Sequence, residues 1–136
     1  MKIVIQRVLN ARVLEESNLI TKIDKGIVIY VGIEIDESEQ SIRWLENQIL
    51  NNLNSEEEAL ILSQFTLFAT FKSGKPSFHK AERPLIAEKY FYNTVSELKM
   101  AIPDRIQNGI FGRKLNIELQ FEYPNAKYLE SSTIDL

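Results

Sequence analysis

The 136-residue chain has no cysteine and a single histidine, His79. Without cysteine there is no disulfide bond, no thiolate nucleophile and no cysteine-bound zinc, and a reducing cytoplasm is the expected location. A single histidine excludes zinc sites of the H-E-x-x-H type, which need two. His79 remains a candidate imidazole base, although a histidine beside a loop lysine is more often a surface residue.

Long apolar segments are also lacking. A membrane-spanning helix needs about 20 consecutive apolar residues, and no segment approaches that length. Arg7 and Arg12 interrupt the first apolar stretch too early for the apolar region of a signal peptide. The G-x-S-x-G elbow, the Walker phosphate loop and the dinucleotide-binding glycine pattern are absent as well. These absences argue against a membrane partner and against the common hydrolase and nucleotide-binding classes.

An overall positive charge is the third feature that the chain lacks. The net charge is −3 and the pI is near 5.3, so any contact with RNA must be local. Basic residues gather in two places, with Lys72, Lys75, Lys80 and Arg83 around one loop and Arg105, Arg113 and Lys114 further on. The simpler interpretation is solvated loop charges balanced by Glu82 and Glu88, and the alternative is a docking site for an anion.

The composition is that of an ordinary globular protein. Hydrophobic residues make up 44% of the chain and charged residues 26%, so neither disorder nor a fibrous repeat is indicated. A chain of this length has room for one compact domain, and we predict a single domain over residues 1–136.

Apolar patterns predict strands separated by two helices. The strand patterns lie at residues 2–8, 11–15, 19–23, 27–33, 59–68, 115–121 and 128–129. The run at 27–33 is apolar throughout, which indicates a central strand with both faces buried. Because strands and helices do not alternate strictly, we predict an α/β class closer to α+β, with a mixed, largely antiparallel sheet and two main helices.

The first helix is expected to follow Asp36-Glu37-Ser38-Glu39, which supplies capping and first-turn acids. Its apolar face would consist of Ile42, Leu45, Ile49 and Leu53, with Trp44 at the margin or at a subunit contact. The second helix would run from about Pro84 to Met100 and end before Pro103. We expect solvated or turn conformations for Glu56-Glu57-Glu58 and for Gln107-Asn108-Gly109.

The buried strand that begins at Ala59 ends in the polar segment Ser63-Gln64-Phe65-Thr66. Strand alternation would place Gln64 and Thr66 on one face, where they could share a pocket. Exposed main-chain amides there could hold an oxyanion during acyl transfer. The alternative is that Thr66 is only a good strand former and Gln64 an edge residue, and the strand pattern alone does not decide between the two.

Four motifs resemble those of the D-aminoacyl-tRNA deacylase family. The start, Met1-x-x-Val4-Ile5-Gln6-Arg7-Val8, is similar to the start of these proteins, as are the glycines at positions 26 and 32. The segment 63–68 resembles the family's S-Q-F-T-L-[YF] signature, and Gly74-Lys75-Pro76-Ser77-Phe78 resembles its G-x-R-P-S-F loop. The segment 107–112 resembles its Q-T-G-x-F-G turn. The matches fall in family order and span nearly the whole chain, so together they are specific.

The resemblance implies a barrel-like fold, a homodimer and hydrolysis of the ester between a D-amino acid and the 3′ end of tRNA, without metal or cofactor. Ser63, Gln64, Phe65 and Thr66 would form the catalytic segment. It would act through main-chain amides together with the adenosine 2′-hydroxyl, because Thr66 has no obvious base to activate it. The residues implied in binding the tRNA end are Arg7, Lys75, Pro76, Ser77, Phe78, Phe111 and Gly112. Phe78, Phe111 and Gly112 would face the adenosine. Lys75 would contact a phosphate, but lysine cannot make the two parallel hydrogen bonds of the arginine that is usual at this position.

Three segments depart from the family pattern. The family's N-x-G-P-x-T segment, whose Gly-Pro pair has a cis peptide and enters the partner's pocket to exclude L-amino acids, corresponds to residues 121–126. Tyr123 stands before Pro124 where glycine is expected, so a position of this selectivity loop that has no side chain in the family carries an aromatic ring here. The link before Ser63 is shorter by roughly a hairpin, and Arg113-Lys114-Leu115 replaces Ala-Asp-Met.

Three hypotheses follow from the resemblance and its departures. The chain is an active D-aminoacyl-tRNA deacylase with a remodelled selectivity loop, or a paralogue with altered aminoacyl preference that acts on glycine or a small L-amino acid. The third hypothesis belongs to another class, a catalytically silent dimeric module that binds tRNA ends or a protein partner.

Overall fold

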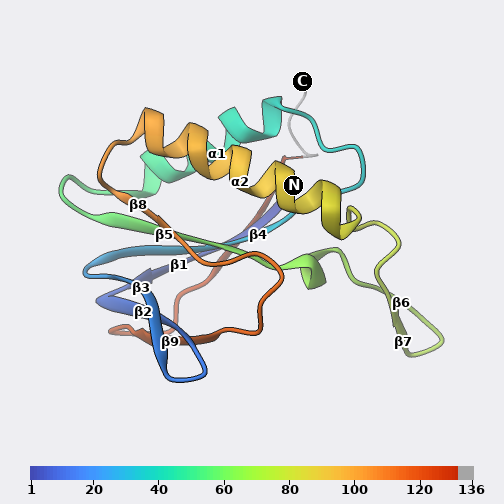
Figure 1. Ribbon diagram of the computed structural model, residues 1–136, viewed down its shortest axis with the longest axis horizontal. Helices are drawn as coiled ribbons and strands as arrows, with labels where there is room; N and C mark the ends of the chain where they lie inside the picture. Colours follow the sequence, from blue (N-terminus) through green and yellow to red (C-terminus); the bar gives the residue numbers. More distant parts are fainter. Residues whose placement is uncertain (132–136) are drawn as a thin grey trace.

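The computed structural model describes residues 1–131, which form three layers (Figure 1). Two helices cover one face of a five-stranded sheet, and a three-stranded sheet packs against the other face. A two-stranded hairpin projects to one side of these layers. The predicted mixed α/β class with two main helices and largely antiparallel sheets is confirmed.

The five-stranded sheet has the order β10-β1-β4-β5-β8. Its strands are β1 (Lys2–Val8), β4 (Gly26–Gly32), β5 (Glu58–Ser63), β8 (Ile106–Asn108) and β10 (Lys127–Glu130). β1 pairs antiparallel with β4 and β10, whereas β4, β5 and β8 are parallel to one another. The parallel strands β4 and β5 therefore end at the same edge of the sheet.

The three-stranded sheet is antiparallel and has the order β3-β2-β9. It consists of β2 (Asn10–Glu15), β3 (Asn18–Ile23) and β9 (Asn116–Gln120). Only Leu9 separates β1 from β2, and its main-chain N–H donates to the carbonyl of Gln120 at 2.7 Å. The chain thus bends from one sheet directly into the other, which gives the barrel-like curvature.

β4 is buried on both faces, as its continuous apolar run predicts. Ile27, Ile29 and Val31 pack in the core under the helices, whereas Val28 belongs to the core between the two sheets. β5 divides its residues in the same way, because successive side chains of a strand point to opposite faces. Burial of each branched side chain stabilises the folded state by about 1.5–3 kcal/mol. Because a shift of one residue would move these side chains to the opposite face, their burial fixes the register of the central strands.

The helices are α1 (Gln40–Asn52) and α2 (Pro84–Ala101), close to their predicted ranges. Trp44 was expected at a margin or a subunit contact, but it is buried in the core beneath the helices. The expected acidic cap of α1 is also absent, because Glu39 at the cap position makes no side-chain hydrogen bond to the helix. Among the described residues, no helix is long and apolar enough to cross a membrane.

Glu57 does not lie in a solvated turn as its acidic neighbours suggest. It is 6% exposed, and its carboxylate receives two hydrogen bonds of 2.9 Å from Arg7. Burial alone would raise the pKa of Glu57, but hydrogen bonding from Asn54 and the guanidinium of Arg7 outweigh it and hold that pKa below its usual value. The Arg7 guanidinium also donates to the carbonyl of Asn52. Arg7 therefore ties β1 to the end of α1 and to the start of β5.

Gln107 and Asn108 were expected in a turn, and they lie instead in β8, paired with β5. The segment is three residues long, which is too short for an apolar pattern to reveal it as a strand.

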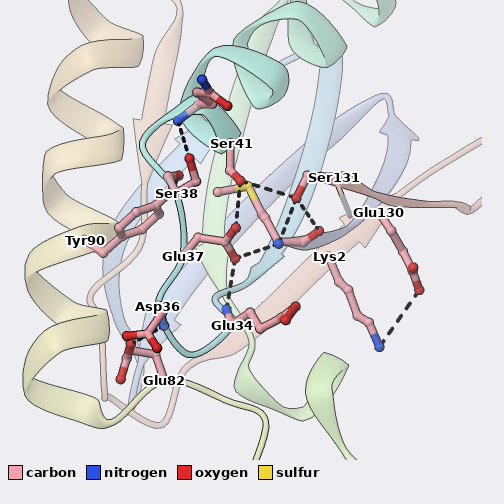
Figure 2. A network of polar contacts seen from close by, with 12 residues as sticks. Lys2, Glu34, Asp36, Glu37, Ser38, Ser41, Glu82, Tyr90, Glu130 and Ser131 are labelled. Atoms are coloured by element: carbon pink, nitrogen blue, oxygen red, sulfur yellow. Dashed lines mark hydrogen bonds and ion pairs between the residues drawn. The ribbon is translucent and has the colours of Figure 1, made fainter. Parts of the chain in front are cut away.

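A buried polar network joins the N-terminus to the start of α1 (Figure 2). The N-terminal ammonium is 2.6 Å from the Glu37 carboxylate and donates to Ser131 Oγ at 2.9 Å. The Glu37 carboxylate also accepts hydrogen bonds from Ser41 Oγ at 2.6 Å and from the main-chain N–H of Glu34 at 3.0 Å. The carboxylate thus neutralises a buried ammonium instead of capping the helix.

Substitution Glu37→Gln should lower the free energy of unfolding by about 3 kcal/mol, because it leaves the buried ammonium without a counter-charge. Urea unfolding followed by circular dichroism measures the effect. Glu39→Gln, which removes the same charge from an exposed neighbour, is the matched control and should change stability by less than about 0.5 kcal/mol. Equal effects of the two variants would contradict the role given to Glu37.

Candidate active site

A cavity of about 700 Å³ opens where β4 and β5 end, beside the start of α2. Its inner wall is apolar and includes Val31 from β4, Ile33 just after it, Leu62 from β5 and Ala87 from α2. The polar segment that begins at Ser63 forms part of the wall. Parallel strands commonly present binding sites at their carboxyl ends, and this cavity has that position.

The Ser63–Phe68 segment changes direction at the cavity. β5 ends at Ser63, Gln64 is extended, and Phe65–Phe68 form a short 3₁₀ turn, η1. The main-chain N–H of Gln64 donates to the carbonyl of Val31 at 2.8 Å, which holds the start of η1 against β4. The first N–H groups of a helical turn have no acceptor within it. The N–H groups of Phe65 and Thr66 are therefore donors that the turn itself leaves open.

Gly32 lets η1 approach β4 this closely. A Cβ atom at position 32 would lie 2.9 Å from Leu67 Cβ and 3.2 Å from the carbonyl oxygen of Gln64. Any other residue would push the turn away from the strand.

The predicted strand alternation fails at Thr66 because η1 replaces the strand after Gln64. Ser63, Gln64 and Phe65 line the cavity, whereas Thr66 is exposed and lies outside its lining. The Thr66 hydroxyl donates to Gln64 Oε1 at 2.8 Å. An amide oxygen is not a base that could deprotonate a hydroxyl, so this geometry does not activate Thr66 as a nucleophile.

Aromatic rings form the rim of the cavity on one side. The rings of Phe65 and Phe78 meet edge to face, with centroids 5.1 Å apart. Phe78 follows the hairpin of β6 (Thr70–Lys72) and β7 (Lys75–Ser77), and both rings are partly exposed, at 58% for Phe65 and 39% for Phe78. Exposed aromatic faces at a cavity mouth are suited to stacking on a base.

The opposite wall is formed by Gly109–Gly112, which follows β8. The main-chain N–H of Phe111 donates to the Tyr92 hydroxyl at 3.0 Å, and the Phe111 ring packs against Phe91 with centroids 5.9 Å apart. Gly109 allows close packing here, since a Cβ atom would lie 2.7 Å from Leu62 Cδ2 and the Leu62 side chain would have to move. α2 thus holds this wall through two aromatic side chains.

Within residues 1–131, three charged residues line the cavity: Glu82 and Arg83 at the start of α2, and Arg113 on the opposite wall. Arg113 Nη1 is bound by both carboxylate oxygens of Glu15, at 3.0 and 2.8 Å. From the sequence, Arg83 and Arg113 were interpreted as solvated charges, with an anion-docking site as the alternative, and Glu82 as one of the residues that balance them. The cue that could have placed two of them is Pro84, which marks the first turn of α2 and sets Glu82 and Arg83 at its entrance.

The structure brings together six of the predicted site residues as cavity lining: Ser63, Gln64, Phe65, Phe78, Phe111 and Gly112. Seven others, Arg7, Thr66, Lys75, Pro76, Ser77, Tyr123 and Pro124, lie outside it. Lys75, Pro76 and Ser77 form β7 of the exposed hairpin. His79 Nδ1 is hydrogen-bonded to Ser77 Oγ at 2.9 Å and does not line the cavity, so it is not placed to act as a base there.

Arg7 and Tyr123 line a second, smaller cavity of about 250 Å³. Arg7 pairs with Ile27 at the start of β4, whereas the first cavity lies at the end of that strand. Asn125 joins Arg7 and Tyr123: its side chain exchanges hydrogen bonds of 2.7 and 3.1 Å with the Arg7 main chain and donates to the Tyr123 carbonyl at 3.0 Å. The Tyr123–Pro124 bond is trans, so the cis bond of the family pattern is not found here.

Comparison with known proteins shows the family of the chain. The D-Tyr-tRNA(Tyr) deacylase family model matches residues 4–129. The chain is 36% identical to a D-aminoacyl-tRNA deacylase of Flavobacterium psychrophilum, with 96% of this chain and 97% of that protein covered. It is 29% identical to D-aminoacyl-tRNA deacylase 1 of Danio rerio, with 96% and 71% covered.

Solved structures show the same fold. The structure of c-Myc DNA Unwinding Element Binding Protein is similar with a TM-score of 0.87 at 28% identity, covering 96% of this chain and 99% of that one. Another, described as a probable eukaryotic D-amino acid tRNA deacylase, has a TM-score of 0.81 at 13% identity, with 94% and 97% covered. Since the family match and the sequence relatives extend over nearly the whole sequence, the chain belongs to the D-Tyr-tRNA(Tyr) deacylase family.

Proposed function

We propose that this protein hydrolyses the ester between a D-amino acid and the terminal adenosine of tRNA, releasing the free amino acid and the tRNA. The observation that carries the proposal is the Ser63–Phe68 segment, which has the family's signature sequence and turns into the wall of the cavity. Family membership over nearly the whole chain supports the same activity. The reaction would remove wrongly charged tRNA in the cytoplasm, where translation takes place.

The main chain of η1 provides the electrostatic part of the proposed mechanism. Attack of water on the ester carbonyl produces a tetrahedral intermediate with a negative oxygen, and the bond to the 3′ oxygen of adenosine then breaks. The open N–H of Phe65, the residue of η1 that lines the cavity, would stabilise that oxygen. No imidazole lines the cavity, so the adenosine 2′-hydroxyl is the proposed participant in proton transfer.

The rest of the tRNA end would be held at the cavity mouth. Phe65, Phe78 and Phe111 offer ring faces to the adenine, because a base can stack on any aromatic surface. Arg83 and Arg113 would supply cations for the phosphates. The net charge of −3 does not predict such a local site for an anion. Lys75, on the exposed β6–β7 hairpin, would meet a phosphate further along the strand.

A deacylation assay with D-Tyr-tRNA, L-Tyr-tRNA and Gly-tRNA tests this function. We expect release of tyrosine from D-Tyr-tRNA at a rate proportional to protein concentration, while L-Tyr-tRNA stays charged. Loss of the glycyl or L-tyrosyl ester instead would support altered aminoacyl preference. Retained binding of tRNA without hydrolysis of any ester would contradict the proposal and support a binding module.

Two substitutions separate the main-chain account from a threonine nucleophile. Thr66→Val removes the hydroxyl but keeps the turn, so kcat should stay within about twofold of the unsubstituted protein. Gly32→Ala places a Cβ against Leu67 and Gln64 and displaces the donors, so kcat should fall at least tenfold, in line with the 10²–10³-fold loss for an oxyanion donor. A thermal unfolding scan checks that both variants remain folded, and a large loss in Thr66→Val alone would overturn the main-chain account.

We further propose that two copies of the chain associate and that each places its Tyr123–Pro124 loop at the cavity of the other. Tyr123 is 61% exposed, and the side chain of Asn125 hydrogen-bonds its loop to the main chain of Arg7 in β1. An exposed aromatic ring on an anchored loop is typical of an interface contact.

Sedimentation equilibrium should give a mass of about twice the 15.7 kDa of one chain. If Tyr123 contacts the partner, Tyr123→Ser should raise the dimer dissociation constant by about tenfold or more, as loss of a buried aromatic anchor does. Tyr128→Ser removes an exposed tyrosine of β10 and serves as the control. A monomer at micromolar concentration would contradict the proposal.

A further inference from the structure

The β6–β7 hairpin, which projects to one side of the layers in Figure 1, carries an exposed aromatic ring of its own. Phe71 in β6 is 73% exposed and lies directly opposite Pro76 of β7, so the two side chains share one face of the hairpin. Neither residue lines the cavity. A single exposed phenylalanine is common on protein surfaces, but Phe71 belongs to a series of such residues that leads to the cavity.

The series continues along β7 to the cavity mouth. Successive side chains of an extended strand point to opposite faces, so strand alternation puts Phe78 on the same side as Pro76, about 7 Å further along. The Phe78 ring contacts the Phe65 ring, with centroids 5.1 Å apart, and both rings line the cavity. An apolar path therefore leads from the hairpin to the cavity mouth, and it consists of Phe71, Pro76, Phe78 and Phe65.

The turn of the hairpin fixes the register of this surface. Ser73 and Gly74 are the two residues between the strands, and both have positive φ angles, of 53° and 76°. Two-residue turns with positive φ at both positions match the twist of the strands that they connect. Because the turn sets which residues pair, Phe71 is held opposite Pro76.

The hairpin is also locally basic in a chain with a net negative charge. No aspartate or glutamate occurs between Glu58 and Glu82, whereas Lys72, Lys75 and Lys80 lie in this stretch. Lys72 and Lys75 are directly opposite each other in the hairpin, and like charges in that arrangement repel. Within residues 1–131, none of the three lysines forms an ion pair with an acidic side chain. A phosphate group would relieve the repulsion, so the hairpin is suited to a polyanion.

A single-stranded nucleic acid has the two properties that match this surface. Its bases stack on aromatic rings, and its backbone carries negative phosphates. Strand alternation directs Lys72 and Lys75 to the face opposite Phe71. Paired strands are only about 5 Å apart, however, and the flexible four-carbon stem of lysine can reach round the edge of the hairpin. The lysines can therefore contact the phosphates of a strand whose base lies on Phe71.

The substrate class named above ends in such a strand, because the 3′ tail of tRNA is unpaired. We propose that the hairpin binds the nucleotide that precedes the terminal adenosine, with the base of that nucleotide stacked on Phe71. The inference rests on the proposed function, in which Phe78 and its neighbouring rings hold the adenine. Phe71 is thus a residue that recognises the tail of the tRNA, and it acts on substrate affinity without touching the reacting ester.

The test compares D-Tyr-tRNA with 3′-O-D-tyrosyladenosine, which has the ester and the adenosine but no preceding nucleotide. Phe71→Ser should lower kcat/KM for D-Tyr-tRNA by about 5- to 100-fold, mostly through a higher KM, as expected for the loss of one base-stacking contact. The same substitution should leave kcat/KM for tyrosyladenosine within about twofold. Phe71→Trp keeps an aromatic ring and should restore kcat/KM for D-Tyr-tRNA to within about threefold of the unsubstituted protein.

Met100→Ser is the matched control, because Met100 is 81% exposed and lies near the end of α2, whereas the start of that helix lines the cavity. This substitution should leave kcat/KM for both substrates unchanged. If Phe71→Ser instead slows both substrates in proportion, the ring serves folding or the association of two copies, which contradicts the proposal. An unchanged kcat/KM for D-Tyr-tRNA in Phe71→Ser contradicts it as well.

A binding experiment separates failure of this inference from failure of the proposed function. Fluorescence anisotropy of a 5′-labelled RNA oligonucleotide that ends in C-C-A measures its Kd without any hydrolysis. Phe71→Ser should raise this Kd by the same factor as it raises KM, and an unchanged Kd would overturn the inference. If the unsubstituted protein hydrolyses neither ester but its Kd depends on Phe71, the proposed function is refuted and the binding surface stands.

Discussion

The cavity depends on the end of β4, where two alternate main-chain carbonyls hold two different parts of the chain. The carbonyl of Val31 accepts the N–H of Gln64 and so fixes η1, and the carbonyl of Ile33, just after β4, accepts the N–H of Glu82 and so fixes the start of α2. β4 can serve as this anchor because it is central in its sheet and buried on both faces. Buried main-chain groups must be hydrogen-bonded, so the strand end imposes its geometry on both segments.

Much of the fold could be predicted because the main elements follow simple periodicities. β4 is a continuous apolar run, β9 alternates, and α2 is delimited by prolines, so each was located to within a few residues. β8 was missed because it is short and its burial comes from the neighbouring strand, not from its own pattern. Glu57 was misassigned because its partner, Arg7, is 50 residues away in the sequence and no local sequence pattern indicates that the two side chains interact.

The site was only partly predictable for the same reason. Ser63, Gln64 and Phe65 could be placed because a buried strand ends there and the motif is specific, but the strand rule put Thr66 into the pocket, whereas η1 turns it outward. That turn depends on Gly32, which lies far away in sequence. Glu82 reaches the cavity through main-chain contacts to Ile33 and Asp36, which side-chain patterns do not encode.

The pairing of β1 with β10 has a consequence for the order of folding. Residues 2–5 pair with residues 127–130, so the outer edge of β1 has no hydrogen-bonding partner until β10 has been synthesised. One edge of β2 likewise has no hydrogen-bonding partner until β9 has been synthesised. Closing such long loops is entropically costly and slows folding. The nascent chain therefore exposes two open strand edges until β9 and β10 have been synthesised, and this is the interval in which chaperone protection or misassembly would act on it.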